Sequence, residues 1–300
     1  MNRILRGTFS ALYTPFTADG AVDREALNAL CHRLLNAGVC LVPCGTTGET
    51  PTLTPQEYRQ VVEIAVAAAD GESPVMVGTG SNHTAGTIAQ TRLAKEMGAS
   101  VALVVAPYYN KPPQRSLVAH FTAVAEEGGL PVVLYNVPGR TSCNMSAETT
   151  LELAEHPNIV AVKEASANMD QIQEVICHAP EGFSVLSGDD AWTLPMLLLG
   201  AHGVVSVAAN VAPSAVVALV QAGLAGELDA ARSIQRTLLD LFSTLFCTTN
   251  PIPVKHAAAH LGHCLPGVRL PLTADVMDAS LMAPLRKALD KAMSLQQTLR

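Results

Sequence analysis

The residue of this chain with the clearest chemical potential is Lys163. It ends a short apolar run at 159–162 and is followed by Glu164. Such a β-branched run is typical of a buried strand, and a lysine at its end is half removed from water. Partial burial disfavours the charged ammonium form and leaves some of the amine nucleophilic, which Schiff-base chemistry requires. The alternative is a surface lysine just past a strand, so the neighbouring motifs have to decide.

Short apolar runs alternate with longer helical patterns along the chain. Eight runs predict strands, because they are short, apolar and bounded by turn residues. They span residues 8–12, 39–43, 75–78, 101–105, 132–135, 159–163, 184–187 and 203–207. Helical patterns lie between them, at 23–37, 84–98 and 146–155. A further helix is predicted to open at Thr54, with a proline at N1 and a glutamate at N3.

Eight strand-then-helix units predict a (β/α)8 TIM barrel over residues 1–225. A doubly wound open sheet is the alternative, but it leads us to expect a glycine-rich segment after the first strand. Tyr-Thr-Pro-Phe stands there instead, at 13–16. Residues 226–300 contain helical patterns at 227–246, 253–261 and 274–299, which predict an all-helical C-terminal domain. No linker rich in Gly, Ser or Pro precedes it, so we expect it to pack on the barrel.

In a barrel of this kind the chemistry lies at the carboxyl ends of the strands. Polar segments follow five of the predicted strands. They are Gly-Thr-Thr-Gly-Glu at 45–49, Pro-Tyr-Tyr-Asn at 107–110, Tyr-Asn-Val-Pro-Gly-Arg-Thr at 135–141, Lys-Glu at 163–164 and Ser-Gly-Asp-Asp at 187–190. We therefore expect hydroxyls, tyrosines, an arginine and a lysine to face one mouth.

Each of these residue types has a physical role. A Gly-Thr-Thr-Gly loop offers backbone N–H groups and two hydroxyls to a small carboxylate, although most such loops are simply turns. A tyrosine relays protons when it is hydrogen-bonded to another acid or base, and otherwise serves as a packing residue with a wet tip. Arg140 has the planar fork that binds a carboxylate, and its alternative is a surface ion pair.

The motifs at 45–49, 135–141 and 162–164 stand in the order and spacing of a known family. The chain resembles the dihydrodipicolinate synthase family, within the pyruvate-dependent class I aldolase (N-acetylneuraminate lyase) superfamily. The resemblance covers essentially the whole chain, including the segments 107–112, 187–190 and 250–255. The lysine and the threonine loop mark the superfamily. Arg140 is what favours the synthase over sialic-acid or sugar-acid aldolases.

This resemblance implies a lyase of lysine and diaminopimelate biosynthesis. Lys163 would form a Schiff base with pyruvate, whose enamine attacks aspartate semialdehyde to give 4-hydroxy-tetrahydrodipicolinate. Tyr135, Thr47 and Tyr109 would form a proton relay, with Tyr109 contributed by a neighbouring subunit. The remaining site residues would bind substrate. They are Thr46 and Thr47 on the pyruvate carboxylate, Arg140 on the semialdehyde carboxylate, and the backbone near Gly188 and Val205 lining the pocket. The family uses no cofactor and is usually a homotetramer built as a pair of tight dimers.

The chain departs from lysine-inhibited relatives at their effector site. Asn82 and Tyr108 match, but Gly86 replaces the glutamate, and Pro55 and Tyr58 replace histidines. A missing carboxylate for the effector's ammonium costs about 1.5–3 kcal/mol of binding. We therefore predict weak or absent inhibition by lysine.

Three alternatives to this function remain in view. Another pyruvate-dependent aldolase or lyase, acting on a sugar acid or hydroxy-oxoacid, would share Lys163 and Tyr135. A non-catalytic sensor of small carboxylates would have lost them. A metal face at His256 and His260 is disfavoured because Gly262 breaks the helix and no His-Glu-x-x-His pattern occurs. We expect no metal.

Composition restricts the partners and the compartment. The net charge of −7 and the pI near 5.7 argue against nucleic acid or an acidic membrane surface as partner. Seven cysteines are scattered without a Cys-x-x-Cys pair, the N-terminus has no apolar signal region, and no apolar run approaches the length of a membrane span. These features predict a reduced, cytoplasmic protein.

Overall fold

A computed structural model describes residues 5–299, so the first four residues of the predicted barrel segment and the last residue of the predicted helical segment lie outside it. Eight parallel strands form one sheet in the order β2-β1-β8-β7-β6-β5-β4-β3. They are β1 Gly7–Ala11, β2 Cys40–Val42, β3 Met76–Gly78, β4 Val101–Val105, β5 Val132–Asn136, β6 Ile159–Glu164, β7 Ser184–Ser187 and β8 Gly203–Ser206. A single parallel bridge from Leu41 to Val75 brings β2 and β3 together, which nearly closes the barrel.

The predicted TIM barrel is confirmed, and its strands lie close to the eight apolar runs. In β5 and β6 every residue is buried, as expected of parallel strands that are covered on both faces. Alternate side chains fill the barrel interior, where Phe9, Leu103 and Val133 pack together, while the others pack under the surrounding helices.

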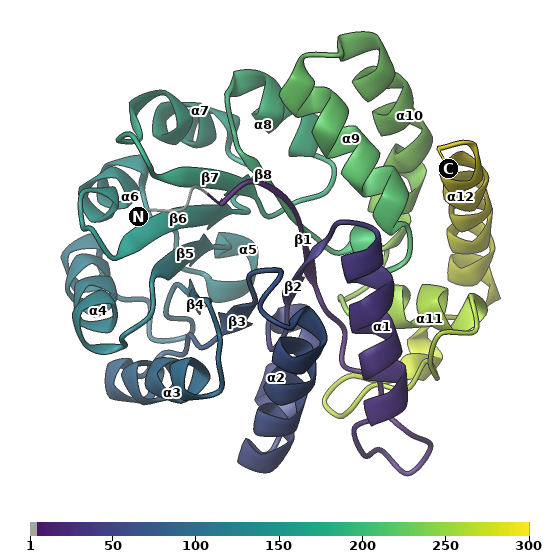
Figure 1. Cartoon of the computed structure of the whole chain (residues 1–300), viewed down its shortest axis with the longest axis horizontal. Coiled ribbons are helices and arrows are strands. Elements are labelled where there is room, and N and C mark those ends of the chain that lie inside the picture. Colours follow the sequence, from purple (N-terminus) through teal and green to yellow (C-terminus); the bar gives the residue numbers. More distant parts are fainter. Residues whose placement is uncertain (1–4, 300) are drawn as a thin grey trace.

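Helices surround the strands (Figure 1). They are α1 Arg24–Asn36, α2 Pro55–Ala69, α3 Thr84–Glu96, α4 Gln114–Glu127, α5 Pro138–Thr141, α6 Ala147–Ala154, α7 Met169–His178, α8 Thr193–Leu199 and α9 Pro213–Ala225. The predicted start of α2 is confirmed: Thr54 Oγ1 accepts from the backbone N–H of Glu57 at 3.2 Å, and Glu57 Oε2 accepts from that of Thr54 at 2.9 Å. None of the helices within residues 5–299 is long and apolar enough to cross a membrane.

The C-terminal segment is helical, with α10 Leu228–Thr244, α11 Ile252–His260 and α12 Ala279–Thr298. It lies to one side of the barrel (Figure 1), where α10 packs on α9 and α12. The predicted helix at 274–299 is wrong at its start. Residues 274–276 form a separate 3₁₀ turn, and Asp278, in extended conformation, caps α12 by accepting from the N–H groups of Ser280 and Leu281.

The helical segment shares one apolar core with the barrel, since Leu238 and Phe242 of α10 belong to the same buried cluster as Val216 of α9. The segment therefore packs on the barrel as expected. The division into domains at residues 225 and 226 stays a prediction.

Candidate active site

Lys163 lies on β6, one residue before the carboxyl end of that strand, with a side chain only 6% exposed. It is the register partner of Tyr135 on β5, so both side chains point to the same side of the sheet. The Lys163 ammonium lies 4.0 Å from the centroid of the Tyr135 ring, within cation–π range. The predicted strand-end lysine is thus buried beside the predicted tyrosine.

A cavity of about 180 Å³ opens at this end of the barrel. It is smaller than the roughly 300–1,000 Å³ of pockets for drug-sized ligands, which suits a small metabolite. Its walls come from residues at or beyond the carboxyl ends of six strands, from Leu103 in the middle of β4 and from the C-terminal segment. The lining residues are Ala11, Gly45, Thr46, Thr47, Leu103, Tyr135, Val137, Arg140, Lys163, Ala165, Gly188, Asp189, Val207, Phe246 and Asn250.

The predicted threonine loop forms a 3₁₀ turn at Thr46–Gly48, directly after β2. Thr47 is buried and Thr46 is exposed at the cavity. Thr14, in the segment that follows β1, holds the turn, because its hydroxyl donates to the carbonyl of Gly48 at 2.7 Å. The loop therefore presents one buried and one solvent-accessible hydroxyl to the same space.

Arg140 follows β5 on the short helix α5 and lines the cavity with an exposed side chain. Within residues 5–299 it forms no ion pair. A cation without a protein counter-ion at the mouth of a cavity can bind an anionic group of a ligand.

Gly188 lies where backbone and lysine approach closely. A Cβ on Gly188 would meet Lys163 Cε at 3.1 Å and Ala165 Cβ at 2.7 Å. The backbone N–H of Gly188 donates to the carbonyl of Glu164 at 2.7 Å. Val205 of β8, the other predicted lining position, packs in the barrel interior with Tyr135. The β8 end contributes Val207 to the cavity wall instead.

Tyr109 does not reach the cavity of its own chain. Its side chain is 88% exposed, and its backbone has a left-handed φ of 72°. The preceding Tyr108 is exposed as well. Two adjacent exposed tyrosines form an apolar surface suited to contact with another molecule, and the relay role of Tyr109 stays a prediction.

Two buried carboxyl groups, Glu164 and Asp190, stabilise the segments at the ends of β6 and β7. Glu164 accepts hydrogen bonds from Ser166 N at 2.7 Å and from Asn136 Nδ2 at 3.1 Å, and burial raises its pKa. Asp190 accepts from Val207 N at 3.0 Å and Ala208 N at 2.9 Å, and burial raises its pKa to about 6. These bonds fix the loops after β6 and β7 that frame the lysine.

Sequence reasoning assigned no role to Phe246 and Asn250, which reach the cavity from the C-terminal segment. Asn250 opens the segment 250–255 that belongs to the family resemblance, and this was the only available signal. Lys255, in the same segment, is a second buried amine. It donates to Glu49 Oε1 at 2.8 Å and to Thr14 O at 2.9 Å, so its role is structural.

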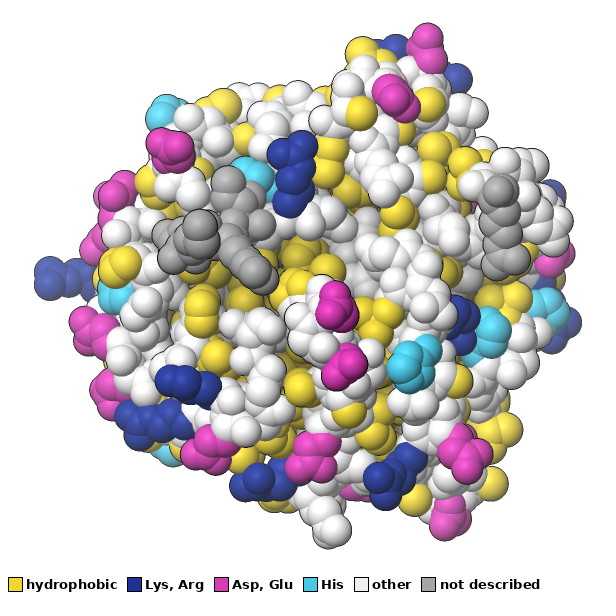
Figure 2. Space-filling view, in the orientation of Figure 1, with side chains coloured by type: hydrophobic (Ala, Val, Ile, Leu, Met, Phe, Trp, Pro, Cys, Tyr) yellow, Lys and Arg dark blue, Asp and Glu magenta, His cyan; other side chains and the backbone are white. Residues whose placement is uncertain are grey.

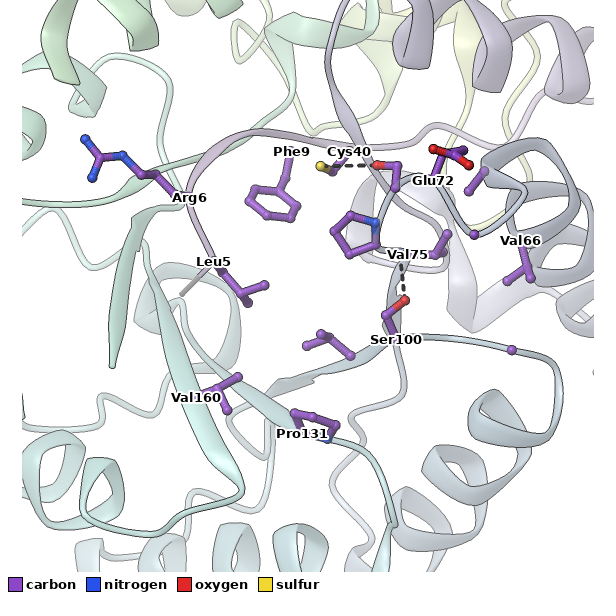
Figure 3. A pocket seen from close by; sticks show the side chains of 16 residues that line it. Leu5, Arg6, Phe9, Cys40, Val66, Glu72, Val75, Ser100, Pro131 and Val160 are labelled. Carbon is purple, nitrogen blue, oxygen red and sulfur yellow. Dashed lines mark hydrogen bonds between the residues drawn. The ribbon is translucent and has the colours of Figure 1, made fainter. Parts of the chain in front are cut away.

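A second, larger hollow of about 460 Å³ lies at the opposite end of the barrel (Figure 3). Its lining residues come from the amino-terminal ends of the strands and include Leu5, Phe9, Val101 and Val160. Hydrophobic side chains gather near the centre of the face seen in Figure 2, and charges of both signs are interspersed around them. In such barrels this face serves stability, so the smaller cavity at Lys163 is the candidate for chemistry.

Among the described residues, no group of three or more His, Cys, Asp or Glu side chains could hold a metal ion. The ring of His256, which sequence reasoning weighed as a ligand, hydrogen-bonds the carbonyl of Ala274 at 3.0 Å.

The fold and the comparisons with known proteins together define a class of enzyme: Schiff-base-forming lyases built on a (β/α)8 barrel. A family model described as the dihydrodipicolinate synthetase family matches residues 4–289. The chain belongs to this family.

Individual relatives agree with this assignment. The 4-hydroxy-tetrahydrodipicolinate synthase of Aquifex aeolicus is 50% identical over 272 residues, which cover 90% of this chain and 92% of that protein. The crystal structure of dihydrodipicolinate synthase from Aquifex aeolicus has a TM-score of 0.92 at 49% identity, covering 96% of this chain and 98% of that one. The chloride-inhibited enzyme from Acinetobacter baumannii, solved in complex with pyruvate, has a TM-score of 0.93 at 40% identity, covering 97% and 99%.

Proposed function

We propose that this chain is a 4-hydroxy-tetrahydrodipicolinate synthase, which condenses pyruvate with L-aspartate-4-semialdehyde. The observation that carries the proposal is the buried Lys163 amine, held 4.0 Å from the Tyr135 ring in a small cavity that also contains Thr46, Thr47 and Arg140. A nucleophilic amine, acid–base hydroxyls and a free guanidinium are what this reaction needs. The relative solved with pyruvate supports the choice of first substrate.

In the first half of the reaction, Lys163 Nζ attacks the ketone carbon of pyruvate. The resulting carbinolamine loses water to give an iminium, and loss of a proton from the methyl group gives an enamine. Thr46 and Thr47 hold the pyruvate carboxylate, because backbone N–H groups and hydroxyls of a tight turn suit an anion. Tyr135, whose ring borders the amine, transfers the protons.

In the second half, the enamine carbon attacks the aldehyde of the semialdehyde and forms a carbon–carbon bond. The amino group of the bound semialdehyde then attacks the iminium carbon, displaces Lys163 and closes the ring. Arg140 holds the carboxylate of this second substrate at the mouth of the cavity. Thr47 and Tyr109 complete the proton relay with Tyr135, with Tyr109 arriving from a neighbouring subunit.

The test is turnover of pyruvate with aspartate semialdehyde, read through a coupled reductase that consumes the cyclic product. Trapping with pyruvate and borohydride, followed by mass spectrometry, locates the covalent adduct. We expect turnover and an adduct on Lys163, and neither in Lys163→Ala. The control Lys287→Ala, at an exposed lysine of α12, should keep both.

Two outcomes would contradict the proposal. An adduct on Lys163 without turnover would point to the other pyruvate-dependent aldolases, which use the same lysine with a sugar acid or hydroxy-oxoacid. Absence of any adduct would point to a carboxylate sensor.

We further propose that lysine inhibits this enzyme weakly or not at all. Gly86 supplies no carboxylate. A Cβ added to Gly86 would lie 2.9 Å from Nδ1 of His83. Tyr58 is buried and donates to the carbonyl of Gly78 at 3.1 Å, so its hydroxyl is already engaged. Only Asn82 and Tyr108 remain, and the Asn82 amide donates to Tyr108 O at 3.3 Å.

The inhibition constant for lysine tests this second proposal, and we expect it in the millimolar range or above. Gly86→Glu should lower it by roughly 10-fold or more, because a carboxylate contact to an ammonium contributes about 1.5–3 kcal/mol. Gly86→Gln has nearly the same size and no charge, and should leave inhibition weak. A submillimolar constant for the unaltered chain would contradict the proposal.

The assembly and compartment complete the proposal. A homotetramer built from two tight dimers would cover the exposed Tyr108 and Tyr109. A biosynthetic enzyme with seven free cysteines suits the reducing cytoplasm. Sedimentation equilibrium tests the first statement, and fractionation of cells tests the second.

A further inference from the structure

Within residues 226–299, Asn250 is the one polar side chain in the cavity wall, and it lies two residues before α11 begins. Its side chain is only 4% exposed. The Nδ2 group donates to Thr47 Oγ1 at 2.9 Å, across 203 positions of the chain. Its Oδ1 atom is buried and has no partner within residues 5–299. A buried amide oxygen without a partner costs free energy, so its retention at a cavity points to a role there.

The bond from Asn250 determines what the Thr47 hydroxyl can do. A hydroxyl carries one proton and accepts through its lone pairs, and an amide N–H can only donate. When Thr47 Oγ1 accepts from Asn250, its own proton stays available for another acceptor. The part of the chain that the structure describes offers it none. The proton is therefore free to point into the cavity, toward a carboxylate or a phenolate beside Lys163.

Further contacts from the C-terminal segment hold the threonine loop in place beside Asn250. Lys255 donates to Glu49 Oε1 at 2.8 Å, and both side chains are almost fully buried. The other oxygen of Glu49 accepts from the backbone N–H of Arg269 at 2.8 Å. The loop that carries Thr47 is thus held to the C-terminal segment at three points: the hydrogen bond from Asn250, the buried ion pair with Lys255 and the backbone N–H of Arg269. Breaking a buried pair by removing one partner costs about 3–5 kcal/mol, so this attachment is rigid.

We propose that Asn250 is a positioning residue that makes Thr47 a hydrogen-bond donor to the substrate and to the proton relay. The proposal rests on the proposed function for the identity of the substrates. It assigns to the helical segment a part in the chemistry, in addition to its part in stability.

Asn250→Asp is the sharpest test, because the new side chain has nearly the same shape. An ionised carboxylate cannot donate, so it would accept the Thr47 proton and turn it away from the cavity. We expect kcat at pH 8 to fall by roughly 10²–10³-fold, the range seen when one donor to a developing charge is lost. As the pH falls and the carboxyl group becomes protonated, it can donate again. The pH profile of kcat should therefore shift toward acid, and the rate of pyruvate trapping by borohydride should follow it.

Gln235→Glu is the matched control. Gln235 of α10 is also an amide whose oxygen is buried without a partner in the described chain, and its Nε2 donates to Ala191 O at 2.9 Å, away from the cavity. This change should leave the pH profile of kcat unaltered. Thermal unfolding of each variant reports separately on stability.

A double-mutant cycle makes the test independent of whether Asn250→Asp folds. If Asn250 acts through Thr47, Asn250→Ala should lower kcat roughly 10-fold in the native background and leave it unchanged in Thr47→Val, because the hydroxyl it positions is gone. Additive losses would overturn the proposal. Two further outcomes would overturn it. A native kcat in Asn250→Asp at pH 8 would mean that the amide accepts a hydrogen bond from Thr47 instead of donating one. Equal losses of kcat in the Asp and Ala variants, with no shift of the pH profile toward acid, would mean that Asn250 has a structural role.

Failure of the proposed function gives a different result. If the native chain does not convert the semialdehyde, the synthase assignment is wrong. The pyruvate-trapping rates of the Asn250 variants would still show whether the Asn250 amide donates to Thr47 or accepts from it.

Discussion

At the residue scale, the site combines one buried amine with one cation that has no counter-ion within residues 5–299. Lys163 is 6% exposed and is surrounded by Tyr135, Ala165 and the backbone of Gly188. Arg140 stands at the solvent side of the same cavity. In the proposed reaction the two charged groups act on different substrates, so mutation can separate their effects.

Arg140→Ala should raise KM for aspartate semialdehyde by roughly 10–100-fold, since a charge-assisted hydrogen bond contributes about 1.5–3 kcal/mol. Pyruvate trapping on Lys163 should be unaffected. Steady-state kinetics with each substrate varied, together with borohydride trapping, measures both effects. Arg140→Lys keeps the charge but not the planar guanidinium, so its KM for aspartate semialdehyde should lie between those of the native enzyme and Arg140→Ala. Loss of pyruvate trapping in Arg140→Ala would contradict the assigned role.

Gly188→Ala should impair the enzyme although it adds a single methyl group. That methyl would press on Lys163 Cε, Ala165 Cβ and the carbonyl of Glu164. Overpacking of this kind costs about 1–3 kcal/mol and displaces the amine, so we expect lower thermal stability and lower kcat. Gly139→Ala, where a Cβ has nothing within 4 Å, should be close to neutral in both measurements. Equal behaviour of the two variants would show that the close approach at Gly188 is unimportant.

Strand-end chemistry was predictable from the sequence where residue type and local pattern coincide. Lys163 and Tyr135 end apolar runs, and Thr47 and Arg140 follow such runs within a few residues, so assigning the strands places all four at one mouth. Asn250 is different, because its partner Thr47 is 203 positions away and no local pattern encodes that contact.

At the element scale, one arginine joins the start of α2 to the loop before α12. Arg269 Nη1 donates to Glu57 Oε2 at 2.9 Å and to Thr52 O at 2.9 Å. Glu57 is also the N3 residue that caps α2 together with Thr54. The hydrogen bond from Arg269 lowers the pKa of Glu57 from 4.5 to about 2. A single side chain thus links a helix cap to the C-terminal segment.

This pair should make stability depend on acid. Because the pKa of Glu57 is lower in the folded state, the contact stabilises above about pH 4.5 and is lost as the pH falls toward about 2. We expect Arg269→Ala to lower the free energy of unfolding by about 1–2 kcal/mol at pH 7, less than the full pKa shift implies because water screens this partly exposed pair. The difference should shrink below pH 4.5. Urea unfolding across this range measures it. Glu57→Gln should show the same trend, and a difference independent of pH would contradict the cause given.

Elements were predictable where caps and apolar runs mark their ends. Thr54 with Glu57, and Ser146 with Thr149, open helices where the pattern placed them. The segment 274–299 failed because its apolar spacing runs on through Asp278, whose side chain caps a new helix. The periodicity of 3.6 residues cannot distinguish one helix from two that are joined by a cap.

At the scale of the whole molecule, Tyr109 is exposed and does not line the cavity of its own chain. If it acts in a neighbour's cavity, oligomers that combine Lys163→Ala with Tyr109→Phe should regain activity. In such a pair, one cavity has its own Lys163 and receives an intact Tyr109. Random pairing in an isologous dimer gives about a quarter of native activity. Co-expression with two affinity tags and a kinetic assay measures it.

A second pair of variants is the control for this experiment. Lys163 and Tyr135 lie side by side in one chain, so mixing Lys163→Ala with Tyr135→Phe should restore nothing. Restoration in both mixtures, or in neither, would show that Tyr109 does not act across subunits.

The attachment of the threonine loop to the C-terminal segment has a consequence for protein synthesis. The ribosome makes Lys163 long before Asn250 and Lys255, and at about 5–20 residues per second the interval is on the order of ten seconds. During that time the strands can assemble, yet the loop at 45–49 has neither its amide nor its ammonium partner. A nascent chain therefore carries the reactive amine before the groups that orient the threonine beside it, and ordering of that loop is among the last steps of its maturation.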